Sequence, residues 1–572
     1  MTSPSLVRVA VAQYAVGADI DANLARALSM LDEVASCKPG LVVLPEFANH
    51  LSWYDDKAHC YQVSVEQDGP FLSAIAAKAA EISAYVVVNV TLRRGAEACT
   101  GSSLLYSPEG NLLAVNDKQV YIGHENDFLE KATEHGPITE TAVGRLGLYA
   151  CMDGVICETP RYLGLRGAQI LCNSLNSFAP DEANLHIPVR ASENRVFVAA
   201  ANKVGPLVPE ELLDVLSGAT NIPVEFLMGA GESQIVAPDG TVLAMADKTA
   251  EGFVFADIDP ALADDKTRPD GTDVFASRRP ELYGPIAADP ATQSEFAATD
   301  CESVQAAMVQ LPFLGEAAIL EAADAVAQAV GAGARLVVLP ELFCYTDDES
   351  KNDDAALARA DIALMALATV CGDEAYVVTS LPQRDGQVIR HSAVLINQQG
   401  VVGSQHQLHS CNRFAWAVEG DEVNIIETPI GRIGMATGDD VIYPEMFRLL
   451  TIAGAEIIAV PFAAQEAWEC RTGLIERAAE NHVCMVAVTQ PSELGCSFGG
   501  TVHKDFTVLT PWETRVFDGN LTYPVTTRMP AESGIGMVEL NPAWTTNKVV
   551  SSGTDVVRGR AWHLADAILA NV

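Results

Sequence analysis

The chain has 572 residues, of which 49% are hydrophobic and 19% charged, and this excludes both a single small module and a disordered chain. Lys and Arg total 36 against 75 Asp and Glu, a formal net charge of -39 that repels nucleic acid and anionic membranes. We therefore expect neither as a partner, and the lack of a long apolar stretch or of a leader-like start predicts a soluble, cytoplasmic protein.

Short apolar runs alternate with amphipathic stretches along the chain. The runs at 7–12, 41–44, 85–90 and 146–150 predict buried strands. Apolar residues at helical spacing predict helices around 24–34 and, later, around 319–330. Strands that alternate with helices indicate a layered α/β fold.

Several segments of the chain occur twice. LVVLPE at 41–46 returns at 336–341, and TAVGRLGLYAC, which begins at Thr141, matches TPIGRIGMATG, which begins at Thr428, 287 positions later. RASEN and RAAEN follow at the same spacing, and GTDV also recurs. This self-similarity predicts a tandem duplication. A Pro-containing acidic stretch without apolar periodicity places the boundary near residue 295, giving domains at 1–295 and 296–572.

Three candidate catalytic residues lie at the ends of predicted strands or within them. Glu46 ends the LVVLPE run, at a strand end where open α/β sheets commonly bind ligands. Lys118 lies in the β-like segment VNDKQVYI, and Cys151 follows a strand and precedes a turn into a predicted helix at 152–163. Amides at a helix N-terminus lower a thiol pKa and hold an oxyanion. Taken singly, each residue has a commoner explanation: a solvated acid, a surface lysine or a buried thiol.

Taken in order, LPEF, the lysine and the pattern GxxxCxDGxxxE resemble the carbon–nitrogen hydrolase (nitrilase) superfamily, and the resemblance covers essentially the whole chain twice. It implies an α/β fold with two tandem four-layer α-β-β-α sandwich domains. It also implies a catalytic triad of Glu46, Lys118 and Cys151, with a further glutamate at Glu125 and, as a weaker candidate, Glu130. Scattered cysteines without zinc spacing agree with chemistry that needs no metal and no cofactor.

The implied chemistry proceeds through a thioester. Glu46 acts as the general base on the Cys151 thiol, and the thiolate attacks a carbon that bears nitrogen. Lys118 and the backbone N–H of Met152 stabilise the oxyanion. Glu46 then protonates the leaving nitrogen, and water activated by Glu46 with help from Glu125 releases a carboxylic acid.

The second copy lacks two of the three groups. It keeps Glu341, but Gly438 stands opposite the cysteine, and Gln405 or Gln407 stands opposite the lysine. Cys411 is the nearest other thiol, but it lies well before the strand end. Two interpretations follow, a structural half-partner or a degenerate site that still binds a ligand, and we favour the first. Family members resemble one another in dimerising through a helical face, which predicts an intrachain pseudo-dimer and leaves a homo-oligomer of the whole chain possible.

The residues around the cysteine favour one branch of the family. CxDG resembles the aliphatic amidase pattern. Gly154 and Val155 stand where carbamoylases often place arginines, which disfavours an anionic substrate unless Arg161 or Arg195 compensates. Asn173 and Ser174 follow a strand and are expected to bind substrate. The leading hypothesis is hydrolysis of a small linear amide. Alternatives are a nitrilase, an N-carbamoyl-amine hydrolase or, in another class, a non-catalytic binding or assembly protein.

Overall fold

The first half of the chain forms two six-stranded sheets that lie face to face, in a computed structural model that describes residues 6–571. One sheet has the order β12 (Gly252–Ile258), β1 (Val7–Gln13), β2 (Leu41–Val43), β3 (Tyr85–Arg94), β4 (Ala98–Tyr106) and β5 (Leu112–Asp117). The other has the order β11 (Val242–Met245), β10 (Gln234–Val236), β9 (Phe197–Ala201), β8 (Ile170–Ser174), β7 (Gly144–Ala150) and β6 (Thr139–Thr141). The predicted strands are therefore present, with bounds shifted by a few residues.

The second half repeats this arrangement. Its first sheet has the order β17 (Gly400–His406), β16 (Val388–Asn397), β15 (Tyr376–Asp385), β14 (Leu336–Glu341), β13 (Val304–Gln310) and β24 (Gly534–Leu540). Its second sheet has the order β18 (Ile425–Thr428), β19 (Gly431–Met435), β20 (Ile457–Pro461), β21 (Cys484–Val488), β22 (Phe498–Thr501) and β23 (Val525–Arg528). The register repeats as well, because Leu41 pairs with Tyr85 as Leu336 pairs with Tyr376. The fold is thus a tandem pair of α-β-β-α sandwiches.

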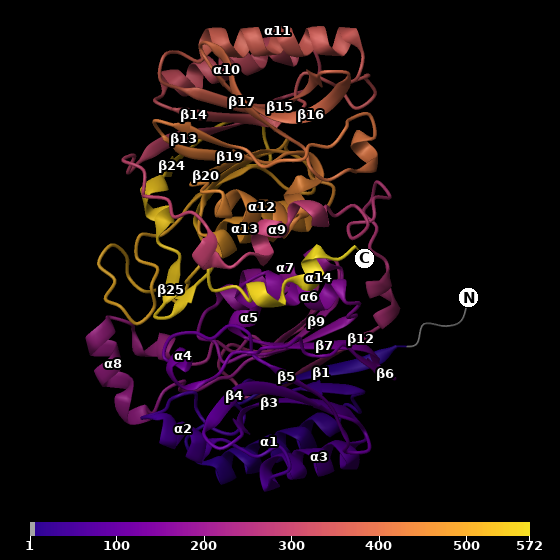
Figure 1. Cartoon of the computed structure of the whole chain (residues 1–572), viewed down its shortest axis with the longest axis vertical. Coiled ribbons are helices and arrows are strands. Elements are labelled where there is room, and N and C mark those ends of the chain that lie inside the picture. Colours follow the sequence, from indigo (N-terminus) through magenta and orange to yellow (C-terminus); the bar gives the residue numbers. More distant parts are fainter. Residues whose placement is uncertain (1–5, 572) are drawn as a thin grey trace.

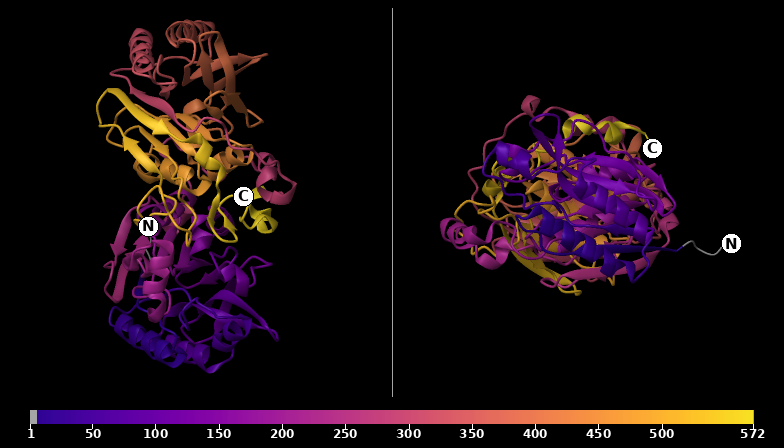
Figure 2. Two further views of the ribbon diagram at one scale, coloured as in Figure 1. Left: turned by 90° about the vertical axis from the view of Figure 1, so that its left-hand side faces the viewer. Right: turned by 90° about the horizontal axis from the view of Figure 1, so that it is seen from below.

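Helices cover the outer faces of both halves and meet at the junction between them (Figure 1). The outer helices are α1 (Ile20–Ala35) and α3 (Pro70–Ile82) in the first half and α10 (Ala318–Gly331) and α11 (Asp354–Val370) in the second. The inner helices are α6 (Glu158–Leu165), α7 (Ile187–Asn194), α12 (Pro444–Ile452) and α13 (Leu474–Asn481). Figure 2 shows the two halves stacked along the long axis, with the C-terminus near the junction.

Local sequence explains the main elements. Helix α1 begins after Asp19, whose carboxylate accepts hydrogen bonds from two backbone amides of the first turn. Its buried residues include Ala27, Met30, Leu31 and Val34, the one-sided spacing that packs a helix on a sheet. Strand β1, by contrast, is buried along nearly its whole length, as expected for a strand covered on both faces.

The predicted helix at 152–163 is interrupted in the structure. Helix α5 (Met152–Val155) ends at Ile156, whose backbone is extended, and α6 begins at Glu158. The guanidinium of Arg190 donates hydrogen bonds to the carbonyl oxygens of Gly154 (2.8 Å) and Val155 (3.2 Å). A buried cation thus satisfies carbonyls that the next helical turn would otherwise use.

The two halves join through an apolar cluster and buried ion pairs. Tyr162 and Val189 of the first half belong to one buried cluster with Met446, Phe447 and Ile475 of the second. Several buried ion pairs cross the same junction, among them Arg161–Glu445, Arg448–Glu158, Arg190–Glu476, Arg190–Glu480 and Arg477–Glu193. The junction therefore buries both apolar and charged surface.

The repeated GTDV segments each contact the other half. Thr272 of the first copy accepts a hydrogen bond from the Asn412 amide through its hydroxyl, at 2.9 Å. Thr554 of the second copy donates from its hydroxyl to the carbonyl of Tyr121, at 2.8 Å. The halves are thus joined by reciprocal contacts of equivalent segments.

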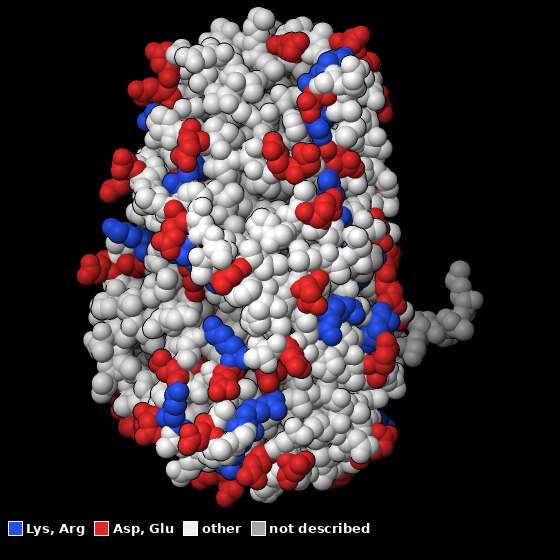
Figure 3. Space-filling model, in the orientation of Figure 1, with Lys and Arg blue, Asp and Glu red and all other residues white. Residues whose placement is uncertain are grey.

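The acidic side chains are scattered over the surface of the protein. On the face shown in Figure 3, Asp and Glu side chains lie over both halves with Lys and Arg among them, and no broad basic area gathers there. No helix within residues 6–571 combines the length and hydropathy required to cross a bilayer.

Candidate active site

Two sheets bring the predicted triad residues toward one place. Glu46 follows β2 and is fully buried, and its backbone N–H donates to the carbonyl of Leu175, which follows β8 in the facing sheet, at 3.1 Å. Lys118 comes directly after β5, and its Nζ lies 2.8 Å from Glu46 Oε1. Cys151 comes directly after β7, which lies between β8 and β6 in the facing sheet. The ends of three strands thus converge, as strand ends commonly do at α/β sites.

Glu125 completes this buried charge cluster. It begins the short helix α4 (Glu125–Phe128), and its Oε2 lies 3.0 Å from Lys118 Nζ. Glu130, the weaker candidate, is exposed to solvent, and its backbone N–H bonds to Cys99. The structure therefore brings Glu125 to the lysine and places Glu130 at the surface.

Burial and neighbouring charges set the protonation states of the three groups. Burial raises the pKa of Glu46 to about 7, against the opposing attraction of Lys118. Burial alone would lower the pKa of Lys118, but the Glu125 and Glu46 carboxylates hold it well above its usual value. Burial, and then the Glu46 carboxylate, raise the pKa of the Cys151 thiol well above its usual value. The expectation of a lowered thiol pKa is therefore wrong, because burial has the largest effect on this thiol and raises its pKa.

The cysteine sits on a sharp turn that neighbouring side chains hold in place. Its φ is 49° and its ψ is -109°, an unusual backbone conformation for a non-glycine residue. Its backbone N–H donates to Asn173 Oδ1 at 3.1 Å. Asp153 Oδ1 accepts from the backbone amides of Gln119 (3.0 Å) and Val120 (2.8 Å), which tie the cysteine turn to the lysine turn. Asp153 is the third residue of the CxDG pattern, so that aspartate positions two turns at once.

Cys151 opens into a small cavity of about 50 Å³, space for a few water molecules. The polar lining comprises Cys151, Asn176, Ser177, Asp181, Glu182, His186 and Thr522, and the remaining lining residues are Ile122, Met152, Val155, Phe178, Ala179, Leu521 and Val550. A space of this size and lining suits a small ligand that donates hydrogen bonds.

One of the three predicted substrate-binding residues lines the cavity, and the other two lie behind its wall. Met152 lines the cavity. Asn173 and Ser174 lie behind its wall, because Asn173 accepts the hydrogen bond of the cysteine amide and Ser174 Oγ donates to the carbonyl of Leu44 at 2.8 Å. Arg161, considered as a carboxylate anchor, pairs instead with Glu445 across the junction at 2.8 Å.

Sequence reasoning missed several residues of this site. Lys203, just beyond the end of β9, is fully buried, and its Nζ has no hydrogen-bond partner within residues 6–571. Burial lowers the pKa of Lys203 to about 7, while Glu46 and Glu125 act on it in the opposite direction. Its place after a strand end, like that of Lys118, is the one signal that the sequence carried. Glu182 was also missed, and burial raises its pKa to about 7.

The equivalent place in the second half holds a different set of groups. The strand register puts Gln407 directly after β17, where Lys118 follows β5 in the first half. Gly438 has a φ of 62°, and its N–H donates to Glu341 Oε2 at 3.1 Å. Arg413 Nη1 lies 3.7 Å from Glu341 Oε1, so a guanidinium faces the glutamate here. This place contains a carboxylate and a cation but, at Gly438, no nucleophile.

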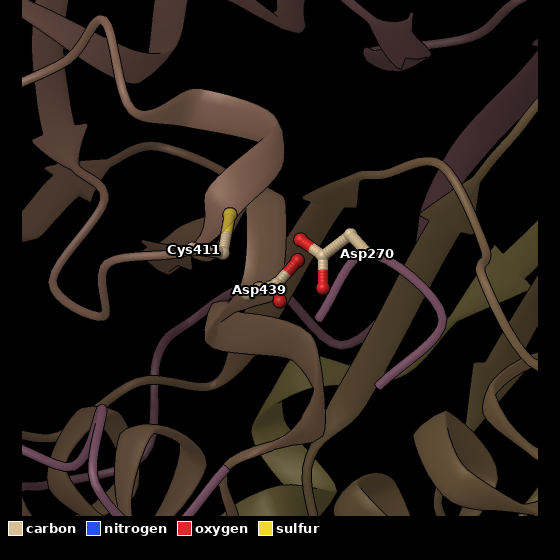
Figure 4. A group of neighbouring side chains, drawn as sticks. All are labelled: Asp270, Cys411 and Asp439. Atoms are coloured by element: carbon tan, nitrogen blue, oxygen red, sulfur yellow. The ribbon is translucent and has the colours of Figure 1, made fainter. Parts of the chain in front are cut away.

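Three possible metal ligands lie beside that degenerate site. Oxygen and sulfur atoms of Asp270, Cys411 and Asp439 lie within 4.8 Å of one another (Figure 4). The guanidinium groups of Arg268 and Arg413 already pair with Asp439. Two resident cations repel a third, so this donor set does not fit a metal ion.

Fold and site together define a class, a hydrolase built as a two-sheet sandwich with a buried cysteine beside a glutamate and a lysine. The family model described as "Carbon-nitrogen hydrolase" matches residues 8–267 and again 305–506. The chain belongs to the carbon–nitrogen hydrolase family, as a tandem member, and is an enzyme that hydrolyses carbon–nitrogen bonds.

Two curated relatives and two solved structures illustrate matches to about one half of the chain. A "Nitrilase" of Pyrococcus abyssi is 25% identical over 264 residues, which cover 46% of this chain and 93% of the relative. "Omega-amidase, chloroplastic" of Arabidopsis thaliana is 24% identical over 300 residues, which cover 50% and 76%. The crystal structure of an amidase from Nesterenkonia sp. is 24% identical with a TM-score of 0.40, and covers 49% of this chain and 95% of the other. The Caenorhabditis elegans NitFhit structure is 21% identical with a TM-score of 0.42, and covers 55% and 72%.

Proposed function

We propose that the chain hydrolyses a small linear amide to a carboxylic acid and ammonia or an amine, through a thioester on Cys151. The observation that carries this proposal is the buried cluster that Lys118 forms with Glu46 and Glu125, together with the effect of Glu46 and Lys118 on the pKa of the Cys151 thiol, which opens into the cavity. The first copy, within the proposed domain 1–295, supplies all of these groups.

The pKa values of Cys151 and Glu46 support attack by a thiol that a general base deprotonates. The raised pKa keeps Cys151 as a neutral thiol near pH 7, so a base must remove its proton. Glu46 has a pKa of about 7, and its Oε2 has no hydrogen-bond partner in the described part of the chain. A carboxylate oxygen with that pKa accepts a proton and returns it at neutral pH.

The proposed reaction returns Cys151 and Glu46 to their starting protonation states. The Cys151 thiol gives its proton to Glu46 as sulfur bonds to the carbonyl carbon, and the oxyanion faces Lys118 and the Met152 amide. Glu46 returns that proton to the nitrogen, and the carbon–nitrogen bond breaks to leave a thioester. Water then gives a proton to Glu46 and its oxygen to the acyl carbon, beside Glu125. The carbon–sulfur bond then breaks, the carboxylic acid leaves, and Glu46 returns its proton to the Cys151 sulfur.

The cavity narrows the substrate class. Its volume of about 50 Å³ restricts the acyl group to a few heavy atoms. Asp181 and Glu182 line it, and one oxygen of each has no hydrogen-bond partner within residues 6–571. Acceptor groups of this kind suit an uncharged or cationic substrate that carries N–H donors, and they disfavour a carboxylate. This is the amide branch, and the amidase named among the solved structures is similar in fold alone.

Release of ammonia from a panel of short amides, nitriles and carbamoyl compounds tests the proposal. We expect turnover of short amides by the wild type and none by Cys151→Ala. Cys411→Ala, at a buried thiol of the second copy, is the matched control and should retain full activity. Intact-protein mass spectrometry should detect an acyl adduct on the wild type and on Cys411→Ala, but none on Cys151→Ala. Equal activity of wild type and Cys151→Ala, or turnover confined to nitriles or carbamoyl compounds, would contradict the proposal.

A further inference from the structure

One loop of the second half is much longer than its counterpart in the first. Strands β10 and β11 are joined by five residues, 237–241, whereas the equivalent β22 and β23 are joined by 23 residues, 502–524. The second match of the family model ends at residue 506, within this loop. The 502–524 loop is thus an addition to the second copy.

The loop packs on its own half, where Phe506 stacks on His482, and it also reaches the cavity of the first half. Asp181 Oδ2 accepts hydrogen bonds from the backbone amides of Leu521 (2.9 Å), Thr522 (2.7 Å) and Tyr523 (3.1 Å). Leu521 and Thr522 both line the cavity beside Cys151. One buried carboxylate of the first half therefore holds the end of the loop at the mouth of the site.

A chain of side-chain hydrogen bonds crosses the junction at the same point. Burial alone would lower the pKa of His186, but Glu476 of the second half raises it to about 9, so both ring nitrogens carry protons near neutral pH. Nδ1 donates to Glu476 at 2.9 Å, and Nε2 donates to Thr522 Oγ1 at 3.1 Å. Thr522 Oγ1 in turn donates to Asp181 Oδ2 at 3.0 Å. This order of donors holds the Thr522 side chain in one orientation.

Apolar contacts fix the rest of the loop. The ring of Phe517 lies 5.8 Å from that of Phe178, a cavity-lining residue, and 5.6 Å from that of Phe226. Trp512 packs on Phe517 from within the loop, at 4.4 Å between ring centroids. These rings belong to or pack against one buried cluster that also contains Met152 of the cysteine turn.

A second segment of the same half supports the lysine side of the site. Strand β25 (Val549–Ser551) places Val550 in the cavity lining. The hydroxyl of Ser551 accepts a hydrogen bond from the Gly123 amide at 2.8 Å, two residues before Glu125. The second half therefore contacts both the wall of the cavity and the turn that carries a charged group of the site.

We propose that the 502–524 loop, together with Val550, forms one wall of the substrate cavity and determines how long an acyl group the site accepts. This inference rests on the proposed amide hydrolysis, because that reaction defines the substrate. The position of the wall is a property of the cavity and does not depend on the reaction. The copy that has lost the nucleophile is, on this account, the specificity half of the enzyme.

Truncation of the wall tests the inference in the full-length protein. Leu521→Ala enlarges the cavity while the backbone amides that bind Asp181 remain, and Val550→Ala does so from the other segment. Val516→Ala, in the same loop at a side chain 82% exposed, is the matched control. We measure kcat/KM for linear amides of increasing acyl length. Urea unfolding midpoints identify any variant that fails to fold.

An alkylation assay provides a readout that needs no turnover. Haloacetamides with N-substituents of increasing size react with Cys151, and peptide mass spectrometry reports the rate at that residue. We expect Leu521→Ala and Val550→Ala to raise the rate for long reagents relative to short ones, and the kcat/KM ratio likewise, by about 10-fold per accommodated methylene. Val516→Ala should leave both ratios unchanged.

The two readouts separate this inference from the proposed function. If folded Leu521→Ala and Val550→Ala behave as Val516→Ala does in both assays, the second half does not form the wall and the inference is overturned. If the wild type hydrolyses no amide but the cavity variants still relax the size selectivity of alkylation, the inference stands and the proposed function fails.

Discussion

The junction between the halves predicts a pH-dependent loss of stability when one buried carboxylate is neutralised. Glu445 is the second residue of α12 and accepts hydrogen bonds from Arg161 Nε at 2.8 Å and Arg278 Nε at 3.1 Å, both of the first half. Burial alone would raise the pKa of Glu445, but these two guanidinium groups lower it from 4.5 to about 2. Glu445→Gln removes the charge while it keeps an acceptor oxygen and the side-chain volume.

The magnitude follows from the pKa difference. A folded-state pKa about 2.5 units below the unfolded value corresponds to about 3 kcal/mol at pH 7, because each unit is worth about 1.4 kcal/mol. This stabilisation is complete above the unfolded-state pKa of 4.5 and is lost as the pH falls through the folded-state value. At pH 3.5 about 2 kcal/mol remains. The variant should therefore lose less stability in acid than at neutral pH.

Urea unfolding of the wild type and of Glu445→Gln at pH 7 and pH 3.5 measures both values. Glu427→Gln is the matched control, because Glu427 is exposed on the second half and its carboxylate forms no ion pair in the described part of the chain. It should change the unfolding free energy by less than about 0.5 kcal/mol. A Glu445→Gln loss under about 1 kcal/mol at pH 7, or an equal loss at both pH values, would refute the assignment of net stabilisation to this pair.

Two further predictions concern the sites themselves. Lys203 lowers the pKa of Glu46, so Lys203→Met should raise that pKa. The acidic limb of the pH profile of kcat/KM should then move to higher pH. A limb that stays in place or moves to lower pH would contradict this prediction. Gly438→Cys, placed in a Cys151→Ala background, should restore no ammonia release, because Gln407 replaces the lysine there. A Cβ at residue 438 would lie 2.4 Å from Gln407 Oε1 at a positive φ, so we expect the unfolding free energy to fall by about 1–3 kcal/mol; restored activity would refute this account of the second copy.

The amino-acid sequence alone determined the duplication, the layered α/β fold and the residues expected to carry chemistry. Local patterns suffice for these, because buried strands are continuous apolar runs and amphipathic helices repeat with a 3.6-residue period. The sequence identified Glu46, Lys118 and Cys151 as candidates because each lies at or just beyond the end of a predicted strand. Their catalytic roles stay predictions that the proposed variants test.

Tertiary structure alone decided the surroundings of those residues. The pKa of Cys151 is raised rather than lowered, since burial depends on packing from segments distant in sequence. The burial of Lys203 and the cavity positions of Asp181 and Glu182 arise in the same way. The contact between Asp181 and Thr522 joins residues that no local pattern relates. The sequence therefore determines which elements form, and the packing of one half on the other determines the cavity that they enclose.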